Sequence, residues 1–207
     1  MGREGHAVFA WAYARIAPRQ DARGTAERRR RLLSVAMGSV VEVGAGTGLN
    51  LRYYPPTVTE VLALEPDPHM FRRLADAVPT ASVPVSVERA PAEPLELADG
   101  SIDTVVMSLV LCSVPDPGAA LAEARRVLVP AGRLLFFEHV RSSDDRLARR
   151  QDRFERPWGW VSGGCHPNRD TVAAIESAGF RIETIDRWDE AGAFLAKPHV
   201  LGWATSP

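Results

Sequence analysis

The segment VVEVGAGTG, residues Val40–Gly48, joins a β-branched apolar run to three glycines at alternate positions. β-Branched residues favour a buried strand, and a glycine lets the backbone approach a ligand closely because it has no side chain. A strand that ends in such a turn presents backbone N–H groups to a nucleotide-like ligand. The segment therefore predicts a strand, a tight turn and a site for a nucleoside-type molecule.

Around this segment the chain alternates between strand and helix patterns, which predicts a parallel sheet with helices on both faces. The predicted strands, in chain order, are 39–43, 58–65, 83–88, 102–108, 132–139, 180–188 and 198–204. The predicted helices are 6–17, 25–36, a short one ending at 54, 67–78, 117–128, an arginine-rich one at 141–157, and 168–178. A loop is predicted at 158–167, so the regular alternation stops after residue 139.

The composition bounds the class of protein. The 207 residues are 45% hydrophobic and 25% charged, with a net charge of -1 and two cysteines. This balance is typical of a globular domain and excludes a disordered chain or a disulfide scaffold. A net charge near zero attracts neither nucleic acid nor an anionic surface. We expect a cytoplasmic protein, monomeric or homodimeric, with no stable membrane anchor and no nucleic-acid partner.

Two further residues narrow the class of ligand that this turn is expected to bind. A dinucleotide fingerprint GxGxxG would need its third glycine at position 49, which is Leu49 here. Glu65 ends the next predicted strand, where an acid can accept both ribose hydroxyls in such folds. Together these features favour an adenosyl ligand over a nicotinamide dinucleotide.

The acid at 42, the GxGxG turn and Glu65 resemble the first two motifs of the class I S-adenosylmethionine-dependent methyltransferases. The resemblance implies an α/β fold, a doubly wound Rossmann-like three-layer sandwich whose seven-stranded, mostly parallel sheet has an antiparallel last strand. It also implies S-adenosyl-L-methionine as the cofactor. We expect N-terminal capping helices over 1–37 and the methyltransferase domain over 38–207, with a substrate-side insertion at about 141–168.

The same resemblance implies a set of cofactor-binding residues. Glu42 is expected to order the turn, Glu65 to hold the ribose, and Ala92 and Glu93 to lie along the adenine. Tyr13 is expected either to reach the cofactor carboxylate or only to pack a capping helix. The full predicted set is Tyr13, Glu42, Gly44, Ala45, Gly46, Gly48, Asn50, Glu65, Pro66, Met70, Ala92, Glu93, Ser108 and Leu109.

A closer resemblance, to the thiol S-methyltransferases, appears in five short segments. These segments are Tyr53–Pro56, Val110–Val114, Glu138–Val140, Gly164–His166 and Lys197–Val200. The resemblance implies S-methylation of a small-molecule thiol by in-line displacement. Methylation of an amine, phospholipid headgroup, quinone or secondary metabolite at N, O or C is the alternative. A non-catalytic cofactor-binding module and an RNA-binding methyltransferase are alternatives of another class.

Two histidines are the candidate catalytic residues. His139 ends the fifth predicted strand, where ligands bind in open α/β sheets, and His166 lies in a glycine-rich loop beside Cys165. His139 equally fits a histidine that seals the strand end, and turn geometry alone can explain the loop around His166. The spacing of Cys112 and Cys165 matches no metal motif, so no metal is expected. Arg28–Arg31 is expected to form a solvated helix face.

Overall fold

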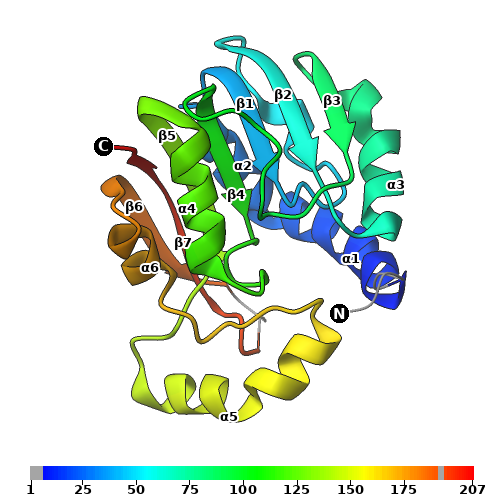
Figure 1. The fold of residues 1–207 in the computed structure, drawn as a ribbon. Coiled ribbons are helices and arrows are strands. Elements are labelled where there is room, and N and C mark those ends of the chain that lie inside the picture. Colours follow the sequence, from blue (N-terminus) through cyan, green and yellow to red (C-terminus); the bar gives the residue numbers. More distant parts are fainter. Residues whose placement is uncertain (1–6, 191–193) are drawn as a thin grey trace.

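The computed structural model describes residues 7–190 and 194–207. One seven-stranded sheet, in the order β3-β2-β1-β4-β5-β7-β6, forms the centre of the chain (Figure 1). β7 is antiparallel to both of its neighbours, and the other pairs are parallel. The strands are β1 (Gly38–Val43), β2 (Val58–Leu64), β3 (Val85–Glu88), β4 (Ile102–Ser108), β5 (Leu128–His139), β6 (Arg181–Asp189) and β7 (Pro198–Thr205). The expected doubly wound sheet with its antiparallel last strand is confirmed.

Helices cover both faces of this sheet. They are α1 (Ala7–Gln20), α2 (Ala26–Leu33), α3 (Pro68–Ala77), α4 (Pro117–Val127), α5 (Asp145–Val161) and α6 (Thr171–Ser177), with short helical turns at Asp21–Thr25, Leu51–Tyr53 and Val78–Thr80. An aspartate at the N-cap of α3, α4, α5 and α6 accepts a backbone N–H of the first turn. Such caps satisfy N–H groups that the helix itself leaves unpaired, which explains why these helices begin where they do.

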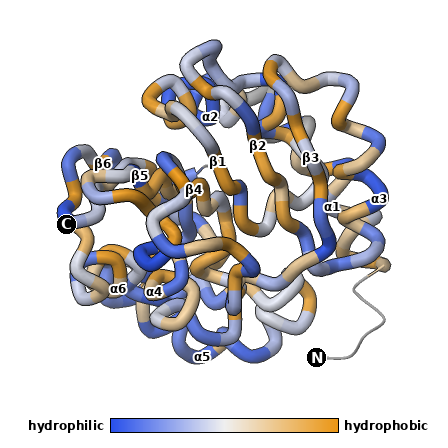
Figure 2. Tube along the Cα trace, turned by 45° about the horizontal axis from the view of Figure 1, so that its top comes forward, coloured by the Kyte–Doolittle hydropathy of each residue, from blue (hydrophilic) through white to orange (hydrophobic). Residues whose placement is uncertain are grey.

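The two faces of the sheet bury separate clusters of side chains. In β1, Val41 and Val43 belong to one cluster with α4 and α6, whereas Val40 belongs to the other with α2 and α3. This alternation follows from the period of two along a strand. Figure 2 shows the hydrophobic residues concentrated along the central strands, whereas much of the outer helix α5 is hydrophilic.

Two helices end later than the sequence predicted. α1 was expected to stop at Pro18 but runs to Gln20, and α5 includes Pro157 and runs to Val161. A proline inside a helix removes one backbone hydrogen bond and its ring crowds the carbonyl four residues earlier, but the residues that follow it can still donate their own N–H groups and continue the helix. Ser162 closes α5 by donating both its N–H and its hydroxyl to the carbonyl of Trp158. Within the described residues, no helix combines the length and the apolar character needed to cross a membrane.

Candidate active site

A pocket opens at the carboxyl ends of β1 and β4. The strand order reverses between these strands, and such a switch point is where open α/β sheets bind ligands. The turn after β1 supplies one wall, Ser108 at the end of β4 another, and α1 contributes Tyr13. The lining residues are Tyr13, Arg29, Glu42, Gly44, Ala45, Gly46, Thr47, Leu49, Asn50 and Ser108.

The three glycines of the turn have different roles. A Cβ on Gly44 would come within 2.6 Å of Val110, and one on Gly48 within 2.8 Å of the Ala77 side chain on α3, so both positions are closed by packing. A Cβ on Gly46 would meet nothing within 4 Å, although its φ of +61 is in the left-handed region that disfavours other residues. Gly46 therefore faces the open space of the pocket.

Glu65 lies directly against this turn. Its Oε2 accepts the N–H of Gly46 at 2.8 Å and its Oε1 accepts the N–H of Asp67 at 2.9 Å. Burial raises the pKa of Glu65, and the two backbone N–H donors oppose that rise. Each carboxylate oxygen retains a further lone pair, so the group can also accept hydroxyl donors from a ligand.

Glu42 is held in a closed network below the turn. Its two oxygens accept the Asn50 amide and the Tyr54 hydroxyl, each at 2.7 Å. Burial raises the pKa of Glu42, and these two donors lower it. The network pins the chain on either side of the glycines, which agrees with the expected role of Glu42 in ordering the turn.

Arg29 is a pocket residue that the sequence reasoning missed. The expectation of a solvated Arg28–Arg31 face is wrong at this position, because Arg29 is only 5% exposed. Its guanidinium donates to Asp21 at 3.0 Å, to Asn50 Oδ1 at 2.9 Å and to Ser108 at 3.4 Å. The sequence did contain a sign of this burial, because Arg29 lies three and four residues before the buried Leu32 and Leu33 and so on the same face of α2.

Five other predicted cofactor residues are outside the pocket lining and lie in segments that follow β2, β3 and β4, namely Pro66, Met70, Ala92, Glu93 and Leu109. Met70 is 5% exposed and Ala92 9%, whereas Pro66 is exposed. Glu93 has a buried Oε2 with no hydrogen-bond partner among the described residues. Leu109 adopts a φ of +61 and donates its N–H to the carbonyl of Phe137, which fixes the turn that follows β4.

Glu138 fixes the next residues of that turn. Its fully buried carboxylate accepts the N–H groups of Val110 and Leu111, each at 2.9 Å, and of Cys112 at 3.1 Å. An acid inside an apolar strand needs such donors, because an unpaired buried carboxylate is costly. Glu138 therefore joins the end of β5 to the segment that carries Cys112.

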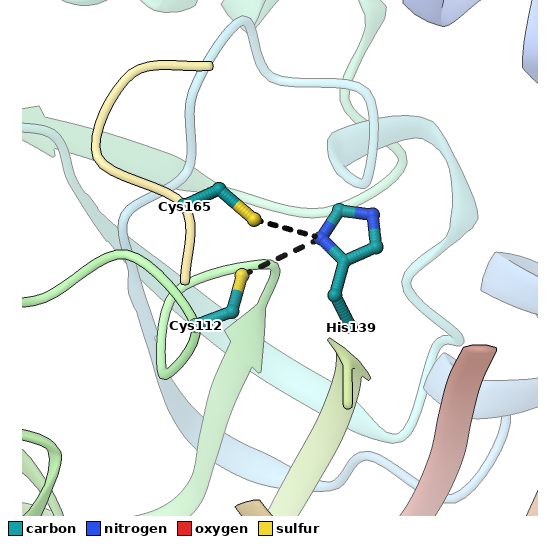
Figure 3. Close-up of side chains that lie close together, drawn as sticks. All are labelled: Cys112, His139 and Cys165. Atoms are coloured by element: carbon teal, nitrogen blue, oxygen red, sulfur yellow. Dashed lines mark hydrogen bonds between the residues drawn. The ribbon is translucent and has the colours of Figure 1, made fainter. Parts of the chain in front are cut away.

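His139, the next residue, lies between two cysteine thiols (Figure 3). Its Nδ1 is 3.6 Å from Cys112 Sγ and 3.4 Å from Cys165 Sγ. The pKa of the Cys112 thiol is raised because it hydrogen-bonds to Cys165 and is fully buried. The His199 ring lies 4.6 Å from the His139 ring, and burial together with His139 lowers the pKa of His199 to about 3. The structure thus groups residues that the sequence reasoning considered separately.

His166 points elsewhere. Its Nδ1 pairs with Glu155 of α5 at 2.6 Å. Its backbone N–H donates to the carbonyl of Cys112. The side chain belongs neither to the pocket lining nor to the group around His139. His139 is also outside the pocket lining, and the catalytic roles predicted for both histidines stay predictions.

The pocket fits the adenosyl cofactor that the sequence implies. The open space at Gly46 admits a ligand against bare backbone, and Glu65 has a buried carboxylate beside it. The buried Oε2 of Glu93, which has no hydrogen-bond partner among the described residues, provides an acceptor in the segment expected to lie along the adenine. Arg29 supplies a buried cation in the same pocket, suited to a carboxylate.

Comparisons with known proteins show what the chain is similar to in sequence and fold. A family model described as a methyltransferase domain matches residues 41–136. Thiol S-methyltransferase TMT1B of Homo sapiens is 35% identical over 210 residues, covering 95% of this chain and 85% of that protein. Thiol S-methyltransferase TMT1A of Homo sapiens is 33% identical over 177 residues, covering 80% and 70%. A solved structure from Bacillus halodurans has a TM-score of 0.74 at 15% identity, covering 87% of this chain and 98% of that one, and shares the fold.

Proposed function

Because the chain belongs to the class I S-adenosylmethionine-dependent methyltransferases, within the methyltransferase type 11 group related to the thiol S-methyltransferases, we propose that it methylates the sulfur of a small-molecule thiol. The observation that carries the choice of sulfur is the 35% identity to TMT1B across 95% of this chain. The pocket geometry supports binding of the cofactor, and the two cysteine sulfurs beside the end of β5 support binding of a thiol acceptor.

The chain's own residues have separable tasks in binding. S-adenosylmethionine supplies a methyl group already activated by its sulfonium. Gly46 leaves room for it, Glu65 accepts its ribose hydroxyls, and Arg29, with Tyr13 beside it, pairs with its carboxylate. These contacts fix the direction from which an acceptor must approach, since displacement at a methyl carbon is in line.

The acceptor side lies at the ends of β4 and β5. Val110 contacts the turn at Gly44, so the segment that carries Cys112 adjoins the cofactor pocket. His139 and the two buried sulfurs provide a weakly hydrated surface there. Such a surface suits a thiol, whose reactive form is the thiolate and whose ordinary pKa is about 8.5. His139 positions the acceptor, and alignment with the activated methyl group supplies the rate.

The pH dependence of the rate tests the acceptor atom. Two thiol acceptors, one aliphatic and one aromatic with a lower pKa, are compared at saturating cofactor. Because the thiolate fraction grows as the pH rises through the thiol pKa, both rates are expected to rise and then level. The aromatic thiol is expected to reach its plateau at the lower pH. Identical midpoints for the two thiols, or turnover of neither, would count against sulfur as the nucleophile.

A further inference from the structure

Three side chains that bind soft metals converge at the carboxyl edge of the sheet. Cys112 follows β4, His139 ends β5 and Cys165 follows α5, and their ligand atoms all lie within 4.8 Å of one another. Both cysteines are free thiols. We infer that Cys112, His139 and Cys165 form a Zn²⁺ site with three protein ligands and one open position.

The distances suit a tetrahedral ion. Zinc bonds of about 2.3 Å to sulfur and 2.0–2.1 Å to nitrogen separate the two ligand atoms by about 3.5–3.6 Å. The separations here are 3.6 Å from His139 Nδ1 to Cys112 Sγ and 3.4 Å to Cys165 Sγ. Figure 3 shows the same nitrogen directed at both sulfurs, with the other ring nitrogen turned away. Both nitrogen–sulfur separations therefore match those around a tetrahedral zinc ion, and the two sulfurs lie within 4.8 Å of each other.

Charge also favours a divalent ion at this position. Cys112 and Cys165 are 0% and 4% exposed, so two bare thiolates there would be costly. When Zn²⁺ binds, each thiol loses its proton to solvent and His139 contributes the neutral lone pair of Nδ1. Two thiolates and one Zn²⁺ sum to zero charge, which the interior tolerates.

The surrounding backbone already fixes the ligands. Glu138 accepts the N–H of Cys112, and the Cys112 carbonyl accepts the N–H of His166, which adjoins Cys165. Outer contacts of this kind orient metal ligands and support affinity. Sequence spacing could not reveal the site, because the ligands are 26 and 27 residues apart along the chain.

The open fourth position gives the site its chemistry. Zinc held by three protein ligands binds an exogenous ligand at the fourth position and favours the deprotonated form of that ligand. Of the three ligands, His139 is the one that is not fully buried. This step rests on the proposed function: the fourth ligand is the acceptor thiol, which binds as a thiolate after losing its proton to solvent and leaves as a neutral thioether once its sulfur has taken the methyl group.

Metal titration of the full chain tests the site. The protein is stripped with a chelator, kept reduced with a phosphine and titrated with Zn²⁺. We expect one ion bound and two protons released per chain, and a rise in Tm of about 5–10 °C at a hundredfold excess over Kd. Cys112→Ser and Cys165→Ser are expected to weaken binding by more than the 10- to 100-fold that loss of an outer contact costs. His166→Ala is the matched control and should bind zinc as the wild type does, because its contact to Cys112 is through the backbone.

A second titration, with Co²⁺, distinguishes a failure of the metal site from a failure of the proposed function. Co²⁺ in place of zinc should give sulfur-to-metal charge-transfer absorption that changes when a small thiol is added and does not change with the matching alcohol. Failure of the wild type to bind one zinc, unchanged affinity in both serine variants, or a disulfide between the two cysteines in protein purified with zinc would overturn the site. Cobalt binding without a response to thiol would overturn the fourth-ligand step alone. A chain that methylates amines but binds zinc would instead refute the proposed function and leave the site standing.

Discussion

Glu138→Ala is expected to lower the free energy of unfolding by about 3–5 kcal/mol, a large part of the stability of an ordinary domain. The substitution leaves the N–H groups of Val110, Leu111 and Cys112 without the carboxylate that accepts them. Each buried donor left unpaired costs about 1–3 kcal/mol. Urea unfolding followed by circular dichroism measures the loss.

Glu183→Ala on β6 is the control for this change. Glu183 is an exposed acid that contacts Arg181 and Thr205 at the surface, so its loss should shift the urea midpoint little. Glu138→Gln should fall between the two, because an amide can accept from Val110 and Leu111 but presents an NH₂ group to the third donor. A Glu138→Ala protein as stable as Glu183→Ala would show that the carboxylate does not hold the turn after β4.

Gly46→Ala is expected to weaken S-adenosylmethionine binding at least about tenfold, or 1.4 kcal/mol. The added Cβ meets no protein atom within 4 Å and so would occupy the space that we assign to the cofactor. Calorimetric titration measures the affinity of each variant.

Gly100→Ala offers a closely matched control. Gly100 has a φ of +58 against +61 for Gly46, and its added Cβ also meets nothing within 4 Å. Both substitutions carry the same left-handed strain of about 1–2 kcal/mol in folding. Only Gly46→Ala should lose affinity for the cofactor. Equal affinities in the two variants would place the ligand away from the turn.

Local patterns were sufficient to predict the strands and the turn after β1, whereas the antiparallel last strand was expected from the family resemblance. The apolar run before Gly44 and the acid at Glu65 were each recognised from residues close in sequence, and in the structure Gly46 donates its N–H to Glu65. Helix starts at Asp67 and Asp116 likewise follow from capping, which acts within one turn. These features could be predicted because their causes are local.

The rest of the site depends on contacts between distant segments. Arg29 belongs to the pocket only because Asn50 and Ser108 accept from it across the fold. Cys112 and Cys165 meet because β4, β5 and the end of α5 share one edge of the sheet, which their spacing does not reveal. The structural role of Glu138 was not predicted, because the three N–H groups that its carboxylate accepts belong to the turn after β4, which is distant in sequence. Such contacts depend on the order of the strands in the sheet, and the periodicity of hydrophobic residues in the sequence does not reveal that order.

The measurement that bears most directly on the proposed activity is a competition among acceptors that differ in one atom. An alkyl thiol, amine and alcohol of the same chain length are mixed at equal concentration with the protein and S-adenosylmethionine carrying a deuterated methyl group. Mass spectrometry of the products should show the labelled thioether and no labelled amine or ether. Labelled amine or ether in place of the thioether would contradict a thiol S-methyltransferase.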